Sequence, residues 1–331
     1  VFTTGAEFFV PQTLDEPITP SNLIVKQQTA FGMKPGIRLQ NVDGSTLFIQ
    51  RQGKALQEFV FSDSVQAYTS SKISLLSSHL LKSPEEMAVR VATSTDEGDR
   101  LMIVNGDDGS IACYTLLRSQ NVIAPSEWTT DGEFLNIGVD VDDIYVVVKR
   151  TINSVDAYYV ELFDADVLLD SAKTGGAASS VTMDHLEAET VKVIRDGIIE
   201  AEQTVPASPY TVTFVTAATS SYQVGINFTP EIKTLPVEPN LSSGSLRGFK
   251  KRIFEVNAEL FETQAMTING KLVPFRNFGG NVLDTAVEEF TGIKTAHGIL
   301  GYSYDGQITI GQTVPLKMTV LGIDYKVSAG Q

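Results

Sequence analysis

The residues able to bind metals are scattered along this chain. Its three histidines, His79, His185 and His297, lie more than 100 residues apart from one another, and none belongs to a pair with zinc-like spacing. The acidic run Asp140-Val141-Asp142-Asp143 suggests a calcium loop, but Ile144 occupies the third oxygen position and no glycine follows. We therefore expect a solvated turn at this run, structural or surface roles for the histidines, and neither a metal nor another cofactor.

Candidate nucleophiles lack the surroundings that activation requires. Gly301-Tyr302-Ser303-Tyr304-Asp305 approaches the serine elbow of hydrolases, but the closing glycine and the strand-then-helix context are absent. The single cysteine, Cys113, lies in the apolar run IACYTLL and is expected to be a buried core thiol. Chance carboxylate pairs are unavoidable among 40 acidic residues, so no glycosidase pair can be nominated, and neither GxGxxG nor GxxxxGK[ST] occurs. We expect no catalytic residue and no enzyme activity.

One basic cluster could contact a partner. It consists of Arg247, Lys250, Lys251 and Arg252, and it could meet DNA or an acidic neighbouring subunit. The simpler interpretation is the solvated lead-in to a strand. Four charges cannot make a general nucleic-acid binder of a chain whose 25 basic and 40 acidic residues give a net charge of −15.

Three aromatic residues suggest another kind of contact. Trp128, Tyr158 and Tyr159 could stack on sugar rings, although packing in a core or interface explains them more simply. This alternative makes the chain a β-rich glycan-binding or receptor-binding module of a phage or bacterium. A polysaccharide-cleaving propeller is a further alternative, because a fold does not settle a function.

A β-meander is the clearest structural signal. Three apolar-polar alternations between Phe134 and Phe163 are separated by short turns rich in Asp and Asn, as expected for strands with one buried face. Hairpin turns are predicted at Asp43-Gly44, at Asn105 to Gly109 and at Asp196-Gly197, because such residues tolerate positive φ. Other predicted strands lie in these segments: AEFFV, SNLIVKQQTA, STLFIQRQG, KALQEFVFS, RLMIVNG, SIACYTLL, YTVTFV, SYQVGINFT and RIFEVNAELF.

The predicted fold class is mainly β, a propeller-like array of antiparallel four-stranded blades or meanders with an additional small β module and very little helix. We expect propeller-like blades in residues 1–170, a small β module bounded by flexible linkers in 171–240, and a C-terminal β segment in 241–331 that completes the body or an inter-subunit contact. Ser77 to Arg90 is the one predicted helical or turn-like stretch, since Ser83-Pro84-Glu85-Glu86 has the composition of a helix start.

The sequence predicts neither a membrane-spanning segment nor a signal peptide. No apolar run approaches the roughly 20 residues that span a bilayer, and VFTTGAEFFV lacks the layout of a signal peptide. The sequence begins without Met and within a predicted strand, so we expect that an N-terminal portion is absent.

Several segments resemble one family, the tail nozzle or tail tubular protein B type of short-tailed bacteriophages and prophages. No single segment is diagnostic, but the order of the segments and the joint presence of DHLE…TVKVIRDG and KTLPVE make chance similarity improbable. The similar stretches extend over nearly the whole chain: VFTTGAEFFV, ITPSNLIVKQQTAFG, LFIQRQGKALQEFVFS, ISLLSSHLL, WTTDGEFLNIGVDVDDIYVVVKR, YYVELF, MDHLEAETVKVIRDG, VGINFTPEIKTLPVE, KKRIFEVNAELFET and VPLKMTVLGI.

The resemblance implies a non-enzymatic virion structural protein, made in the bacterial host cytoplasm and located in the phage tail. Its implied partners are copies of itself in a ring, hexameric in the full-length protein, together with the head-to-tail adaptor and tail fibre or spike proteins. Double-stranded DNA would pass through the ring without specific binding. Family members are longer at the N-terminus, which leaves the oligomeric state of this chain open.

Overall fold

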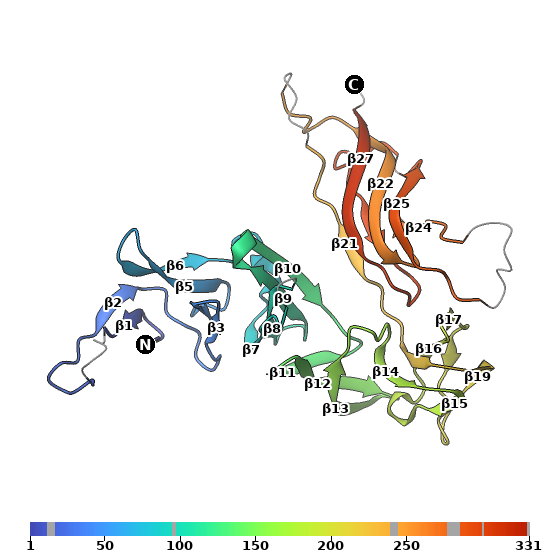
Figure 1. The fold of residues 1–331 in the computed structure, drawn as a ribbon, viewed down its shortest axis with the longest axis horizontal. Coiled ribbons are helices and arrows are strands. Elements are labelled where there is room, and N and C mark those ends of the chain that lie inside the picture. Colours follow the sequence, from blue (N-terminus) through green and yellow to red (C-terminus); the bar gives the residue numbers. More distant parts are fainter. Residues whose placement is uncertain (12–16, 95–96, 239–243, 277–284, 300, 330–331) are drawn as a thin grey trace. The chain divides into compact units, whose positions relative to one another are not determined.

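The computed structural model describes residues 1–11, 17–94, 97–238, 244–276, 285–299 and 301–329 (Figure 1). The chain divides into two compact units, Val1–Asp164 and Ala165–Gln331, here called unit 1 and unit 2. Each unit is described by itself.

Unit 1 consists of an N-terminal hairpin followed by three antiparallel sheets whose neighbouring strands are consecutive in the sequence. We call these the first sheet (β3 to β6), the second sheet (β7 to β10) and the third sheet (β11 to β13). The elements are β1 (Glu7–Phe9), β2 (Lys26–Thr29), β3 (Gln40–Val42), β4 (Ser45–Ile49), β5 (Leu56–Ser62), β6 (Ala67–Lys72), η1 (Ser78–Leu80), β7 (Pro84–Arg90), β8 (Asp99–Asn105), β9 (Ile111–Leu117), η2 (Arg118–Gln120), β10 (Val122–Trp128), β11 (Glu133–Asp140), β12 (Asp143–Ile152) and β13 (Val155–Phe163).

The three sheets of unit 1 pack against one another through two buried clusters. Leu47 of the first sheet and Leu101 of the second belong to one cluster, whereas Met102 of the second sheet and Val146 of the third belong to the other. Successive side chains of a strand point to opposite faces, so the second sheet is covered on both faces. Unit 1 is therefore a series of stacked β layers.

The N-terminal segment covers the outer face of the first sheet. The ring centroid of Phe2 lies 5.2 Å from those of Phe48 and Phe59, and the ring centroid of Phe9 lies 4.9 Å from that of Tyr68. Phe48 is only 1% exposed. Aromatic packing at these distances buries much apolar area, and it closes this end of the series of layers.

The predicted mainly β fold, with four-stranded antiparallel blades, meanders and very little helix, is confirmed. The predicted hairpins are present as well. Asp43 and Gly44 have φ of +46° and +76°, Asp196 and Gly197 have φ of +49° and +75°, and Gly109 has φ of +63°. These left-handed conformations match the twist of the strands that the turns connect.

Of the helical or turn-like stretch predicted over Ser77 to Arg90, the helix start at Ser83-Pro84-Glu85-Glu86 is wrong. Only the short 3-10 turn η1 (Ser78–Leu80) forms there, and Pro84–Arg90 is strand β7 at the edge of the second sheet. Pro84 is the first residue of an edge strand, where its missing N–H costs little, and burial of Met87 and Ala88 favours pairing with β8 over an isolated helix.

The first half of unit 2 holds short antiparallel sheets. One has the order β14-β20-β16-β17, with β18 also paired to β16, and another pairs β15 with β19. The elements are β14 (Asp170–Gly175), β15 (Ala178–Thr182), η3 (Asp184–Leu186), β16 (Thr190–Arg195), β17 (Ile198–Ile199), β18 (Gln203–Thr204), β19 (Thr211–Ala218) and β20 (Tyr222–Ile226).

The Asp196 side chain ties two turns of this region together. Its carboxylate accepts hydrogen bonds from the backbone N–H groups of Thr219, Ser220 and Ser221, at 2.8 to 3.1 Å, and from the hydroxyls of Thr219 and Ser220. These donors favour the charged form and hold the pKa of Asp196 far below its usual range. The predicted Asp-Gly hairpin thus also positions the connection between β19 and β20.

The second half of unit 2 contains two sheets around one buried cluster. One sheet has the order β25-β22-β27 and the other β21-β26-β23-β24, and the cluster includes Ile253, Val256, Ile268 and Ile310. The strands are β21 (Glu231–Lys233), β22 (Lys251–Thr263), β23 (Thr267–Ile268), β24 (Lys271–Leu272), β25 (Phe290–His297), β26 (Thr309–Gly311) and β27 (Val320–Ala329).

The predicted three-part division at residues 170 and 240 stays a prediction. Strand β21 pairs with β26, which joins residues 231–233 to the C-terminal strands although the division grouped them with the small module. Pairing between strands distant in sequence leaves no local signal, and the prolines of TLPVEPN suggested a boundary after β21 rather than before it.

Candidate functional site

The predicted basic cluster does not present four charges at the surface. Lys251 is 3% exposed, because it occupies an inward position of β22 and bridges to Ser303 through both backbone groups, at 2.7 and 2.8 Å. Arg247, Lys250 and Arg252 are exposed. Three accessible cations remain at the start of β22, and their contact with DNA or a neighbouring subunit stays a prediction.

Two of these three cations also have neighbours within the chain. Nε of Arg247 lies 3.9 Å from Oε2 of Glu238, and Nζ of Lys250 lies 5.8 Å from the ring centroid of Tyr304. The Arg247 side chain is 87% exposed, so its ion pair contributes little to stability.

The aromatic residues predicted to stack on sugars do not converge. Tyr158 and Tyr159 are consecutive in β13 and therefore point to opposite faces of the third sheet. Trp128 packs against Phe163, with ring centroids 4.9 Å apart. Of these three aromatic residues, Tyr158 is the one that offers a broad ring surface to a ligand, since it is 64% exposed.

The acidic run forms a solvated turn, as predicted. Asp140 pairs with Asp143 across the β11–β12 connection, Val141 adopts φ of +57°, and Asp142 Oδ1 lies 3.1 Å from Nη2 of Arg90. Among the described residues, no three His, Cys, Asp or Glu side chains are grouped so that they could hold a metal ion.

The candidate nucleophiles Cys113 and Ser303, and the histidine His185, are buried or make hydrogen bonds to the backbone. Cys113 is buried, as predicted, and burial raises the pKa of its thiol to about 11. Ser303 Oγ accepts a hydrogen bond from the N–H of Gly306 at 3.0 Å. Nε2 of His185 lies 2.9 Å from the carbonyl oxygen of Ser171.

The least expected surface is the outer face of the third sheet. In the register of β12 and β13, Tyr145 lies opposite Leu162 and Val147 lies opposite Val160, all on the face away from the buried cluster. Tyr145, Leu162 and Val160 are 40%, 51% and 73% exposed. We call this set, together with Tyr158, the outer apolar face.

The same strands bury a charged group on their other face. The Arg150 side chain is fully buried; Nε and Nη2 donate to the two carboxylate oxygens of Glu161 at 2.8 and 2.7 Å, and Nη1 donates to the carbonyl oxygen of Asp131 at 2.6 Å. A bidentate pair of this geometry holds β12 and β13 in register. The third sheet therefore has a buried charge on its inner face and exposed apolar side chains on its outer face.

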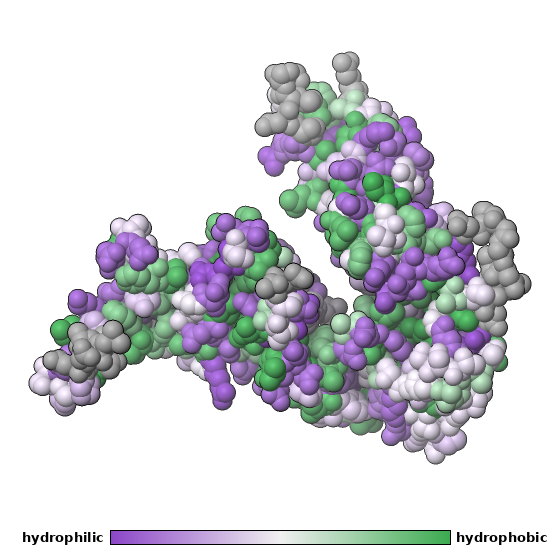
Figure 2. All heavy atoms as spheres, in the orientation of Figure 1, coloured by the Kyte–Doolittle hydropathy of each residue, from purple (hydrophilic) through white to green (hydrophobic). Residues whose placement is uncertain are grey.

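Hydrophobic and hydrophilic residues both reach the surface throughout the view in Figure 2. Scattered apolar residues are normal at a protein surface, whereas contiguous groups indicate a contact site. The outer apolar face belongs to the second kind, because its members are neighbours across two paired strands. Sequence reasoning predicted the strands but did not single out this face. The signal was present in YYVELF, where Tyr158, Val160 and Leu162 share one parity.

Comparisons with known proteins find no sequence match and only a weak structural likeness. No family model matches this sequence, and no curated protein matches it either. An exo-β-1,3-galactanase from Phanerochaete chrysosporium, solved with galactose, is similar over 91% of this chain and 72% of its own, with 9% identity and a TM-score of 0.27. A variant of that enzyme with β-1,3-galactotriose is similar over the same shares, with 10% identity and a TM-score of 0.26.

The expectation that this chain is not an enzyme is corrected, because the similar solved structures are those of an enzyme. At these TM-scores the likeness assigns neither an activity nor a substrate to this chain. Among the described helices, none is long and apolar enough to cross a membrane.

Proposed function

We propose that this chain is a structural subunit of the tail of a short-tailed bacteriophage, of the tail nozzle type, and that copies of it form part of a ring around a passage for double-stranded DNA. The observation that carries the proposal is the outer apolar face at the end of a series of stacked β layers. The first sheet is covered by the N-terminal segment and by the second sheet, and the second sheet is covered on both sides.

A further β layer from a neighbouring copy would give the third sheet the same environment as the second. Its contact would remove Tyr158, Val160 and Leu162 from water, and burial of apolar area is the main favourable term in association. Contacts between different surfaces of identical subunits generate rings when the rotation closes. An uncovered face at one end of the layers is what such an arrangement requires.

The resemblance to tail nozzle proteins supports the same proposal. Its segments coincide with elements that build the cores of both units: LFIQRQGKALQEFVFS contains the end of β4 and all of β5, and KKRIFEVNAELFET contains β22. The charge of −15 also suits a conduit, since attraction between its wall and the phosphates would slow a polymer that carries about one charge per 1.7 Å of axis.

This function would place the protein in the virion, after synthesis in the host cytoplasm. Its partners would be copies of itself, the head-to-tail adaptor and the tail fibre or spike proteins. The exposed cations Arg247, Lys250 and Arg252 would meet acidic surface of a neighbouring subunit or the passing DNA.

Electron microscopy tests the proposal. Negative-stain images of the full-length protein, alone and with its adaptor, should show rings, and antibodies against this chain should label the tails of purified particles. Particles whose tails bind no antibody, with antibody binding to the free protein as the positive control, would refute the assignment.

A second candidate function is favoured by the aromatic members of the outer apolar face. Tyr145 and Tyr158 expose their rings on the same side of the third sheet, and tyrosine rings beside aliphatic side chains are a surface on which sugars can stack. The chain would then be a glycan-binding or receptor-binding module. A glycan array probed with the wild-type chain and with Tyr158→Ala separates the two functions, because only the glycan-binding function predicts hits that the substitution removes.

A further inference from the structure

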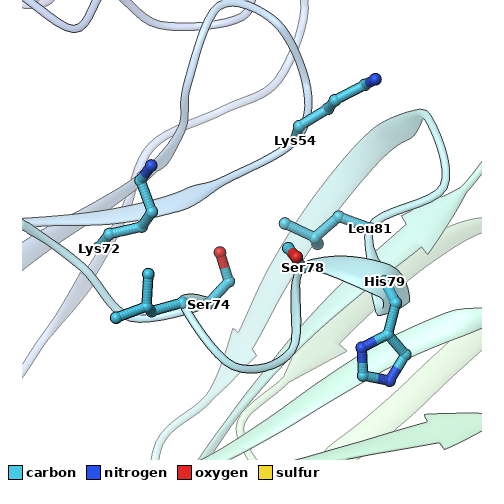
Figure 3. A pocket seen from close by; sticks show the side chains of 7 residues that line it. Lys54, Lys72, Ser74, Ser78, His79 and Leu81 are labelled. Carbon is cyan, nitrogen blue, oxygen red and sulfur yellow. The ribbon is translucent and has the colours of Figure 1, made fainter.

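We propose that a groove in unit 1 is a binding site for a phosphate group, free or as a small phosphate ester. The groove has a volume of about 490 Å³ and lies between the turn before β5 and the segment that connects β6 to β7 (Figure 3). Its lining residues are Lys54, Lys72, Ser74, Leu75, Ser78, His79 and Leu81. This site does not depend on assembly into a tail.

The charge of the lining runs against that of the chain. Acidic residues outnumber basic ones 40 to 25 in the sequence, yet the groove is lined by two lysines and a histidine and by no carboxylate. Some other basic side chains of unit 1 have acidic partners: Lys82 lies 2.6 Å from Asp108, and Arg118 lies 2.6 Å from Glu58. Among the described residues, neither Lys54 nor Lys72 has a carboxylate oxygen within ion-pair distance.

The Ser74 hydroxyl adds a buried donor to this lining. Ser74 is fully buried, and its Oγ accepts a hydrogen bond from the N–H of Leu56 at 2.9 Å. The Ser74 hydroxyl can therefore still donate its own proton. Within the described part of the chain, no group accepts a hydrogen bond from it. Figure 3 shows the Ser74 hydroxyl and the Lys72 side chain projecting to the same side of the connecting segment, with Lys54 on the facing loop.

These groups match the needs of a phosphate. Each lysine offers a full positive charge with three donors, and lysine serves as a point charge in many phosphate sites. Ser74 and Ser78 supply hydroxyl donors, while Leu75 and Leu81 form an apolar wall. The His79 ring projects away from the two lysines in Figure 3, so we assign it no contact with the anion.

A free phosphate fits this setting better than the backbone of a DNA duplex. A duplex would bring many charges against a surface of the same sign, whereas one phosphate group in the groove would face a lining that contains two lysines and no carboxylate. Free phosphate and the DNA backbone both present phosphate oxygens, so a competition experiment between them is needed to tell which one the groove binds.

Titration of the whole chain with inorganic phosphate tests the site. Isothermal calorimetry at constant ionic strength, held with sodium chloride, should show saturable binding. The double variant Lys54→Gln with Lys72→Gln should weaken it by about tenfold or more, the effect of removing charge-assisted hydrogen bonds. The matched control Lys26→Gln changes an exposed lysine of β2 and should leave affinity unchanged.

Serine variants check the donors. Ser74→Ala should weaken phosphate binding several-fold. Because Ser74 also accepts a hydrogen bond from the N–H of Leu56, thermal unfolding must show that this variant is folded. Ser78→Ala, at an exposed position, provides a second test. Equal affinities for wild type and the double lysine variant would overturn the proposal. So would a short DNA duplex that competes with phosphate at physiological salt and loses its binding with the same two lysines, since the site would then be a DNA contact.

Discussion

The second and third sheets of unit 1 are neighbours built from similar antiparallel strands, but their environments differ. Leu101 and Met102, consecutive in β8, are both fully buried because each faces a different layer. In β13 the inner positions face the buried cluster while Val160, on the outer side, is 73% exposed. The number of covered faces, not the strand topology, distinguishes the two sheets.

The sequences of the two sheets record this difference only in part. LMIV in β8 is a continuous apolar run, as expected of a strand buried on both faces. A sheet that faces water on one side normally carries polar residues there, whereas the outer positions of β13 include Tyr158, Val160 and Leu162. Because of this departure from apolar-in, polar-out alternation, the third sheet has the composition of a sheet that is buried on both faces.

Thiol labelling should give the largest contrast between the two sheets. Burial raises the pKa of Cys113 to about 11, so at pH 8 the reactive thiolate is rare, and its fraction grows only as the pH rises toward that value. An introduced Val160→Cys thiol on the outer apolar face should react with a disulfide reagent about 100-fold faster or more in dilute protein. Comparable rates at the two positions in the folded chain would remove the contrast.

The inner and outer faces of β12 should differ strongly in their tolerance of charge removal. Arg150→Met leaves the Glu161 carboxylate without its bidentate partner and should cost about 3–5 kcal/mol of unfolding free energy in urea denaturation. Lys149→Gln, one residue earlier on the outer face, breaks exposed ion pairs at 3.3 and 3.8 Å and should leave stability indistinguishable from wild type. A larger loss for Lys149→Gln would contradict the assignment of faces.

Two leucine truncations compare the sheets with the same chemistry. Leu101→Ala removes a side chain with 0% exposure and should cost about 2–5 kcal/mol, while Leu162→Ala removes one that is 51% exposed and should cost less than about 1 kcal/mol. Chemical denaturation at low protein concentration measures both. A large cost at Leu162 in the monomer would mean that its face is already covered.

Substitution of two glycines, one just before the third sheet and one within it, should give the smallest difference in stability. Gly132 has φ of +144°, and a Cβ there would lie 2.4 Å from the carbonyl oxygen of Lys149, so Gly132→Ala should lower stability by about 1–3 kcal/mol. A Cβ at Gly138 meets nothing within 4 Å, and Gly138→Ala should be neutral or slightly stabilising. Thermal unfolding of both variants checks the difference.

Local signals predicted most strands and turns of this fold. Alternation located β11 to β13, and the Asp-Gly pairs located two hairpins whose φ values are positive at both residues. The helix predicted around Pro84 failed because capping residues of a helix also suit the start of an edge strand, and pairing with β8 decides between them.

The candidate site was less predictable than the fold. Lys251 looked like a surface charge until the register of β22 placed it inward, and Tyr158 was grouped with Trp128 although the two do not share a surface. The groove joins Lys54 to Lys72 and Ser74 through pairing of β5 with β6, which residue spacing alone does not reveal. Sequence patterns fix local conformation, whereas sites depend on which strands become neighbours.

Sedimentation velocity tests the central claim most directly, because it measures whether the outer apolar face joins copies of the chain. The wild-type sedimentation coefficient should rise with concentration, whereas Val160→Lys, a change at a 73% exposed position, should stay monomeric and as stable as wild type. A wild-type chain that remains monomeric at high concentration, or a Val160→Lys variant that associates equally well, would contradict the account.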